Sequence, residues 1–190
     1  MHKRSLAILL VFIVLTAAGC SAARGTGSDK ENHEPIQPTG QIRLAGIYLG
    51  DTAQTVQARL GKGFTEEYFS EGGYFGESIY RWVYPNGIDL IIGEQTGQVL
   101  QIAITGAKLS TSQGDWIGDS AETIVQKYQE KYPQARDHFE GLPLEGWFVV
   151  EEGVWLIFDC NKDDGTFVNE KIGPQSAVEQ MVLVYEKFMD

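Results

Sequence analysis

Apolar and polar positions follow the same order in two stretches of the chain. Residues 49–60 and residues 117–128 align without gaps, and each begins Gly-Asp-Thr or Gly-Asp-Ser before apolar positions spaced for one helical face. Asp51 and Asp119 stand where a side chain can accept from the free N–H groups of a helix start. The pattern therefore predicts a helix at the head of each stretch.

Short runs of alternating residues separated by turn residues follow each predicted helix. They cover residues 79–84, 88–92 and 99–105 in the first stretch and residues 147–150, 154–158 and 178–185 in the second. The predicted fold class is α+β: two tandem helix plus antiparallel β-meander repeats, over residues 46–105 and 114–186, that form one domain.

The alternation also predicts which strand residues face the helices. In the first stretch they are Tyr80, Trp82, Tyr84, Ile88, Leu90, Ile92, Leu100, Ile102 and Ile104, and in the second Phe148, Val150, Val154, Leu156, Phe158, Met181 and Leu183. In the second stretch the opposite positions are apolar too, and they include Trp147 and Trp155. An exposed apolar face of this kind commonly marks an interface, so we predict partner binding at Trp147 and Trp155. The alternative is that residues 159–177 or the N-terminal tether cover this face.

A glycine-rich segment, residues 67–77, carries two Tyr-Phe pairs. Aromatic side chains on loops are frequent hot spots of protein interfaces. Tyr74 and Phe75 are therefore predicted partner-binding residues. The alternative is that the aromatic pairs fold back and cover the end of the core.

The N-terminus combines a basic start, Lys3 and Arg4, an apolar run of about ten residues, and small residues before Cys20. Residues 1–19 resemble a bacterial lipoprotein signal peptide and are too short for a membrane-spanning helix, although an uncleaved anchor is the alternative. We expect acylation of Cys20 and a lipid-anchored position on the extracytoplasmic side of the cell membrane. Residues 20–40 are small and polar, typical of a disordered tether, and residues 41–188 form the predicted globular domain.

Charge limits the possible partners. The 15 basic residues lose Lys3 and Arg4 with the signal peptide, so 13 remain against 26 acidic residues. A surface this acidic repels phosphate, and nucleic acid is not an expected partner.

The sequence has little that predicts catalysis. It contains no Gly-x-Ser-x-Gly and no phosphate-binding glycine loop, so we predict a protein that is not an enzyme and needs no cofactor. Residues 159–170 place oxygen ligands with the spacing of a calcium loop, at Asp159, Asn161, Asp163 and Glu170. The glycine that such a loop requires comes one position late, which favours a solvated loop and leaves calcium as the alternative.

A helix opened by Gly-Asp-Thr or Gly-Asp-Ser and followed by a meander, twice, behind a lipoprotein signal resembles the YjgB-like lipoproteins of Gram-positive bacteria. More distantly, it resembles the tandem-repeat β-lactamase inhibitor proteins and the single-repeat outer-membrane assembly lipoproteins. The resemblance covers Gly46 to about Tyr185 and implies protein binding by the sheet. The expected function is a membrane-anchored lipoprotein that binds another envelope protein as adaptor, assembly factor or inhibitor; a small-ligand or Ca²⁺-binding extracellular domain is the alternative.

Overall fold

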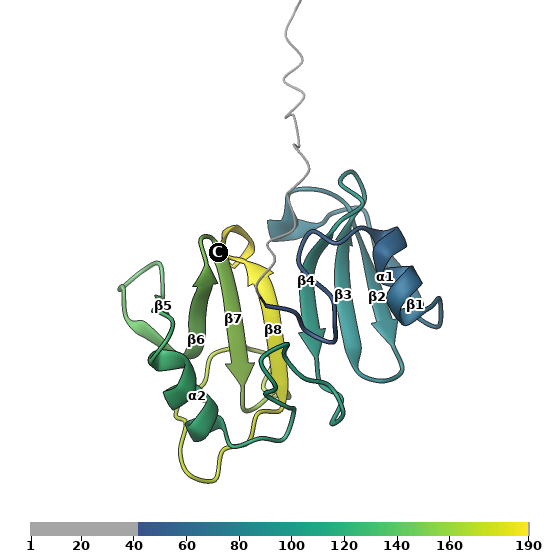
Figure 1. The fold of residues 1–190 in the computed structure, drawn as a ribbon. Helices are drawn as coiled ribbons and strands as arrows, with labels where there is room; N and C mark the ends of the chain where they lie inside the picture. The colour runs from purple at the N-terminus through teal and green to yellow at the C-terminus, as the bar shows by residue number, and fades with distance from the viewer. Residues whose placement is uncertain (1–41, 190) are drawn as a thin grey trace, which may run out of the picture. The chain divides into compact units, whose positions relative to one another are not determined.

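A computed structural model describes residues 42–189 of the chain (Figure 1). The predicted signal peptide, the predicted acylation site Cys20 and the predicted tether lie outside the described residues. No helix within residues 42–189 is both long and apolar enough to cross a membrane.

The two α-helices are short, and each begins one residue later than the sequence suggested. Helix α1 covers Ala53–Leu60 and helix α2 covers Ala121–Gln129. Their caps are Thr52 and Ser120, whose hydroxyls accept from the backbone N–H three residues further on. Asp51 and Asp119 instead accept from Tyr48 N (3.0 Å) and Trp116 N (2.8 Å), which closes the turn before each helix.

All eight strands form one antiparallel sheet in the order β1-β2-β3-β4-β8-β7-β6-β5 (Figure 1). They are β1 (Thr65–Phe69), β2 (Ile79–Tyr84), β3 (Ile88–Gly93), β4 (Val99–Ile104), β5 (Gln134–Arg136), β6 (Pro143–Glu151), β7 (Val154–Asp159) and β8 (Gln180–Tyr185). Two single-turn 3₁₀ helices, η1 (Gly73–Phe75) and η2 (Glu186–Phe188), complete the described elements.

The predicted fold class of two helix plus β-meander repeats is therefore wrong. The fold is dominated by a single sheet, with only two short α-helices in the described part of the chain. Its halves are continuous because β4 pairs directly with β8, with Ile102 opposite Leu183 and Ala103 opposite Val182. Strands β1 and β5, at the two edges, were not predicted, since neither has an alternating apolar pattern.

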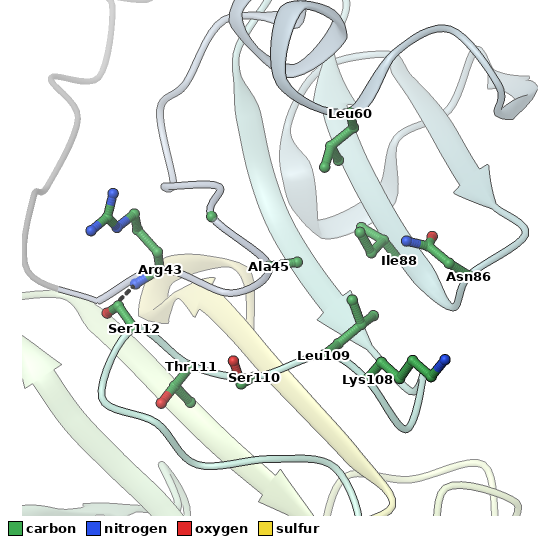
Figure 2. Close-up of a pocket in the computed structure, with 11 residues that line it drawn as sticks. Arg43, Ala45, Leu60, Asn86, Ile88, Lys108, Leu109, Ser110, Thr111 and Ser112 are labelled. Carbon is green, nitrogen blue, oxygen red and sulfur yellow. Dashed lines mark hydrogen bonds between the residues drawn. The ribbon is translucent and has the colours of Figure 1, made fainter.

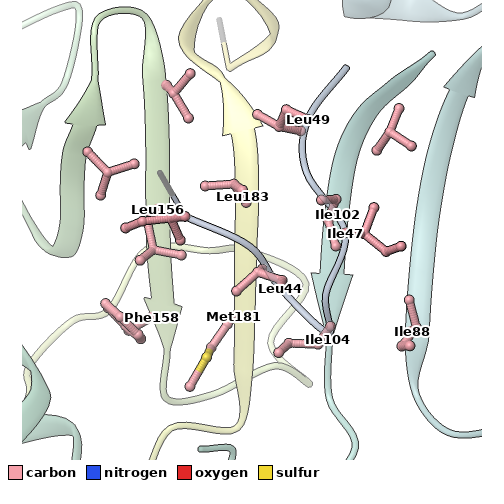
Figure 3. Close-up of a cluster of buried hydrophobic side chains, with 14 of the residues drawn as sticks. Leu44, Ile47, Leu49, Ile88, Ile102, Ile104, Leu156, Phe158, Met181 and Leu183 are labelled. Carbon is pink, nitrogen blue, oxygen red and sulfur yellow. The ribbon is translucent and has the colours of Figure 1, made fainter. Parts of the chain in front are cut away.

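One face of the sheet carries the main core. The core combines strand residues with Val56 of α1, with Ile124 and Tyr128 of α2, and with the segment before α1. Figure 3 shows that segment crossing the face above β4 and β8, with Leu44 and Ile47 among the strand side chains. Both side chains are fully buried, so this segment seals the junction between the two halves of the sheet.

The strand alternation was predicted well, with one exception. The expected helix-facing positions of β6, β7 and β8 all lie in the main core, as do most of those in β2, β3 and β4. Leu100 instead packs with Ile79 and Ile91 on the opposite face. The pairing shifts between Ile91 and Ile92, so that Ile92 faces Val99, and a one-residue shift reverses the side of the next residue.

Candidate functional site

The apolar face around Trp147 and Trp155 is not exposed, which contradicts the predicted open interface there. The two indoles are 5% and 2% exposed and meet edge to face at 5.6 Å between ring centroids. Trp147 Nε1 donates to the carbonyl oxygen of Phe167 (2.7 Å), in the connection that covers this face. The ring of His138 stacks on Trp155 at 5.5 Å. Phe167 covers part of this face, as the alternative expected of residues 159–177, while His138, Phe188 and Met189 cover it from segments that the alternative did not include.

Tyr74 and Phe75 are neighbours in η1 but have different environments. Phe75 folds back onto the sheet and packs against Phe188 of η2, with 5.1 Å between ring centroids. Tyr74 is 73% exposed and makes no hydrogen bond or ring contact with any other residue in the range 42–189. Of the four predicted partner-binding residues, only Tyr74 is presented to solvent.

The four candidate calcium ligands are not brought together. Asp159 points inward and is buried, and its Oδ1 accepts from Asn161 N (2.8 Å). Burial raises the pKa of the Asp159 carboxyl above its ordinary value. Asp163 pairs with Lys162, and Glu170 is exposed. Across the described part of the chain, no three His, Cys, Asp or Glu residues are arranged to hold a metal ion.

Strand β1 presents an aromatic surface at one edge of the sheet. It is the outermost strand, paired only with β2 in the described sheet, and all five of its residues are exposed. Tyr68 and Phe69 are 51% and 42% exposed, and Tyr74 follows in η1. We call Tyr68 and Phe69 the aromatic edge. Tyr74 lies apart from it, because η1 packs against η2 after β8, through the ring contact of Phe75 with Phe188.

Neighbouring side chains hold the aromatic edge in position. Tyr68 contacts the ring of Tyr80 at 5.1 Å and donates its hydroxyl to Glu94 Oε2 (3.1 Å). The buried Glu77 ties the loop after η1 to the next turn, because its Oε2 accepts from Gln95 N (2.6 Å) and Thr96 N (3.2 Å). Gly72 allows the loop to close, since a Cβ there would lie 1.7 Å from the carbonyl oxygen of Glu77. These contacts fix the conformation of the loop that exposes Tyr74.

The aromatic edge is also acidic. Glu66 accepts from Trp82 Nε1 (2.7 Å), and Glu67 lies 3.6 Å from the Arg81 guanidinium. Both glutamates are exposed and adjacent in the strand. A second copy paired along this edge would place like charges together, which is destabilising.

Comparisons with known proteins do not assign this chain to a family. No family model matches it, and no curated protein matches it. A crystal structure of an extracellular protein containing a SCP domain, from Bacillus anthracis str. Ames, is similar with a TM-score of 0.47 and 11% sequence identity. The similarity covers 73% of this chain but only 44% of that chain, and at this level it assigns neither fold nor activity. The resemblance to the YjgB-like lipoproteins stays a prediction.

Sequence reasoning found the aromatic residues but not the strand that carries two of them. The stretch Thr65–Phe69 has two consecutive glutamates and no alternation, because an edge strand with both sides in solvent needs none. Its isolated Tyr-Phe pair was the one signal available, since aromatic residues favour strands.

Proposed function

We propose that this chain is a lipoprotein, anchored through acylated Cys20 on the extracytoplasmic side of the membrane, whose domain binds another envelope protein. The binding surface is the aromatic edge. The observation that carries the proposal is an outermost strand, β1, with all five residues exposed and with Tyr68 and Phe69 at its end.

An edge strand supports binding through its main chain. Its outer side carries N–H and C=O groups to which an extended segment of a partner can pair as a further strand. Aromatic side chains beside the strand then provide the contact area and the selectivity. The glutamates of β1 disfavour pairing with a second copy and favour a partner segment that carries basic residues.

The experiment is photo-crosslinking on intact cells. A photoreactive phenylalanine analogue replaces Phe69 in the full-length lipoprotein, and a second variant carries it in place of Phe139. Phe139 is a suitable control because it is 99% exposed and lies beside β5, at the other edge of the sheet. We expect one discrete cross-linked partner from position 69 and none from position 139.

The Tyr68→Ala substitution then tests the strand itself. Truncating a hot-spot aromatic weakens binding by about 2 kcal/mol, roughly thirtyfold, and the cross-linked yield should fall accordingly. Cross-links that form only at position 139, or that form at position 69 with no change in Tyr68→Ala, would reject the aromatic edge as the binding surface.

A further inference from the structure

A hollow of about 370 Å³ lies on the core side of the sheet, away from the aromatic edge. Its apolar wall is formed by Leu60 at the end of α1, Ile88 of β3 and Leu109, all of which pack with the main core. Figure 2 shows these three side chains facing the same space, with Arg43 and Lys108 on opposite sides of it and with their charged ends directed away from it. A hollow of this volume suits a small organic molecule.

The charge of the hollow is opposite to that of the protein. The chain has 26 acidic and 15 basic residues, yet the lining contains Arg43 and Lys108 and no aspartate or glutamate. Two acids close to the lining are already neutralised. Asp51 is paired with Arg59 at 2.5 Å, and Asp115 is paired with Lys127. The hollow is therefore a local positive region.

The polar groups of the hollow are available to a ligand. The Lys108 ammonium has no ion pair or hydrogen bond among residues 42–189, and within the same range the Arg43 guanidinium makes only a ring contact, 5.0 Å from the centroid of Tyr48. The half-buried hydroxyl of Ser110 is likewise without a hydrogen-bond partner in the described chain.

The backbone beside the hollow is fixed and strained. Leu44 and Ile47 exchange two backbone hydrogen bonds (3.1 and 2.9 Å) across a two-residue turn. Ala45, which lines the hollow, has a φ of 51° and is the one non-glycine residue with positive φ in the range 42–189. Its N–H donates to the carbonyl oxygen of Ser110 (3.1 Å). Strain held by surrounding structure occurs at ligand-binding positions, where a fixed wall lowers the cost of binding.

We infer that this hollow binds a small organic anion that carries an apolar group. The anionic group accepts from the hydroxyl of Ser110, and the exposed side chains of Arg43 and Lys108 turn inward from opposite sides to reach it. The apolar group packs on Leu60, Ile88 and Leu109. A cationic or neutral molecule of the same shape gains nothing from the two basic side chains, so the charge of the ligand determines its affinity.

The test uses 3-phenylpropionate as the probe, with its neutral amide and inorganic phosphate as comparisons. Binding to the full-length protein is measured by calorimetry at low salt, and methyl resonances of Leu60, Ile88 and Leu109 report the position of the probe. We expect saturable binding of the carboxylate with shifts at these methyl groups. The amide should bind at least tenfold more weakly, which is about 1.4 kcal/mol. Phenyl phosphate in a parallel titration distinguishes a phosphate ligand from a carboxylate ligand.

The charge variants decide the proposal. Arg43→Gln with Lys108→Gln should weaken binding of 3-phenylpropionate at least tenfold with little change in the melting temperature, because both side chains are exposed and neither makes an ion pair among residues 42–189. Lys131→Gln with Lys171→Gln changes the net charge equally at exposed positions outside the hollow and should leave binding unchanged. Three outcomes would overturn the inference: no saturable binding at millimolar probe, equal binding of the amide, or equal losses in the two double variants. Inorganic phosphate that binds as well as the probe would contradict the apolar part of the site.

Discussion

The hydroxyl of Tyr128 donates a 2.8 Å hydrogen bond to Oδ2 of the buried Asp115. The same oxygen accepts from Thr111 Oγ1 (2.9 Å), and the other carboxylate oxygen is paired with Lys127. Burial, with Asp115 as the second cause, raises the pKa of Tyr128 far above its ordinary value, so the phenol stays a donor. This cluster joins α2 to the segment before it, and its partners depend on one another.

Tyr128→Phe removes the donor and leaves the buried carboxylate with one bond fewer. We expect the free energy of unfolding to fall by about 1–3 kcal/mol, measured by urea denaturation. The matched control is Tyr74→Phe, which removes the same hydroxyl from an exposed side chain and should have no measurable effect. Equal effects of the two variants would mean that the Asp115 cluster contributes nothing specific.

Trp155→Ala tests whether the tryptophan face is core. Because Trp155 is buried under the ring of His138, truncation should cost about 3–5 kcal/mol and lower the melting temperature by roughly 10 °C. Phe139→Ala, a truncation of an exposed aromatic, should change stability by less than about 0.5 kcal/mol. A stable Trp155→Ala variant would show that this face is open in solution, and partner binding at Trp147 and Trp155 would then be restored as a hypothesis.

The parts of the fold that follow from side-chain periodicity could be predicted, and the parts that follow from edge pairing could not. The alternation of β7 correctly placed Leu156 and Phe158 in the main core and Trp155 on the opposite face. The residues of β4 and β8 do not indicate that these two strands pair, because the hydrogen bonds between them join backbone groups that every residue has. One sheet and two sheets are therefore equally compatible with the pattern.

The aromatic residues of η1 and the residues of the hollow also show what could not be predicted from the sequence. Tyr74 was identified from composition, whereas the fate of Phe75 depended on Phe188, more than a hundred residues away. Arg43, Lys108 and Leu60 come from three separate segments with no motif, so only their arrangement in space brings them to one hollow. A site whose residues are brought together only by the tertiary structure has no local sequence motif from which it could be predicted.

Ala45→Asn should stabilise the protein. Ala45 and Gly46 both have positive φ, as in a type I′ turn, and asparagine adopts this conformation more readily than alanine. We expect a gain of about 0.5–2 kcal/mol in the free energy of unfolding, and hence a higher melting temperature. Ala45→Val should act in the opposite direction, because a β-branched side chain strongly disfavours positive φ. A pair of variants that does not separate in these directions would contradict the strained turn.

Alkaline pH should destabilise the protein through Cys160. Burial raises the pKa of this thiol from its ordinary value of 9.0 to about 11. Between these two values the folded chain binds more protons than the unfolded chain, so the free energy of unfolding falls as pH rises. Urea denaturation from pH 8 to 11 should show this loss, and Cys160→Ala should reduce its slope. Fast alkylation of Cys160 in the folded protein at pH 8 would contradict the raised pKa.

Cys20→Ala tests the membrane anchor. The small residues before Cys20 resemble the processing site of bacterial lipoproteins, in which the cysteine sulfur carries the lipid. Each buried methylene of an acyl chain contributes about 0.8 kcal/mol to membrane binding, so an unlipidated mature chain would not remain attached. We expect the variant to lose label from a palmitate analogue and to accumulate as unprocessed precursor. Cys160→Ala is the matched control and should keep both the label and the processing. Label retained in Cys20→Ala would show that the lipid is attached elsewhere or that residues 1–19 have another role.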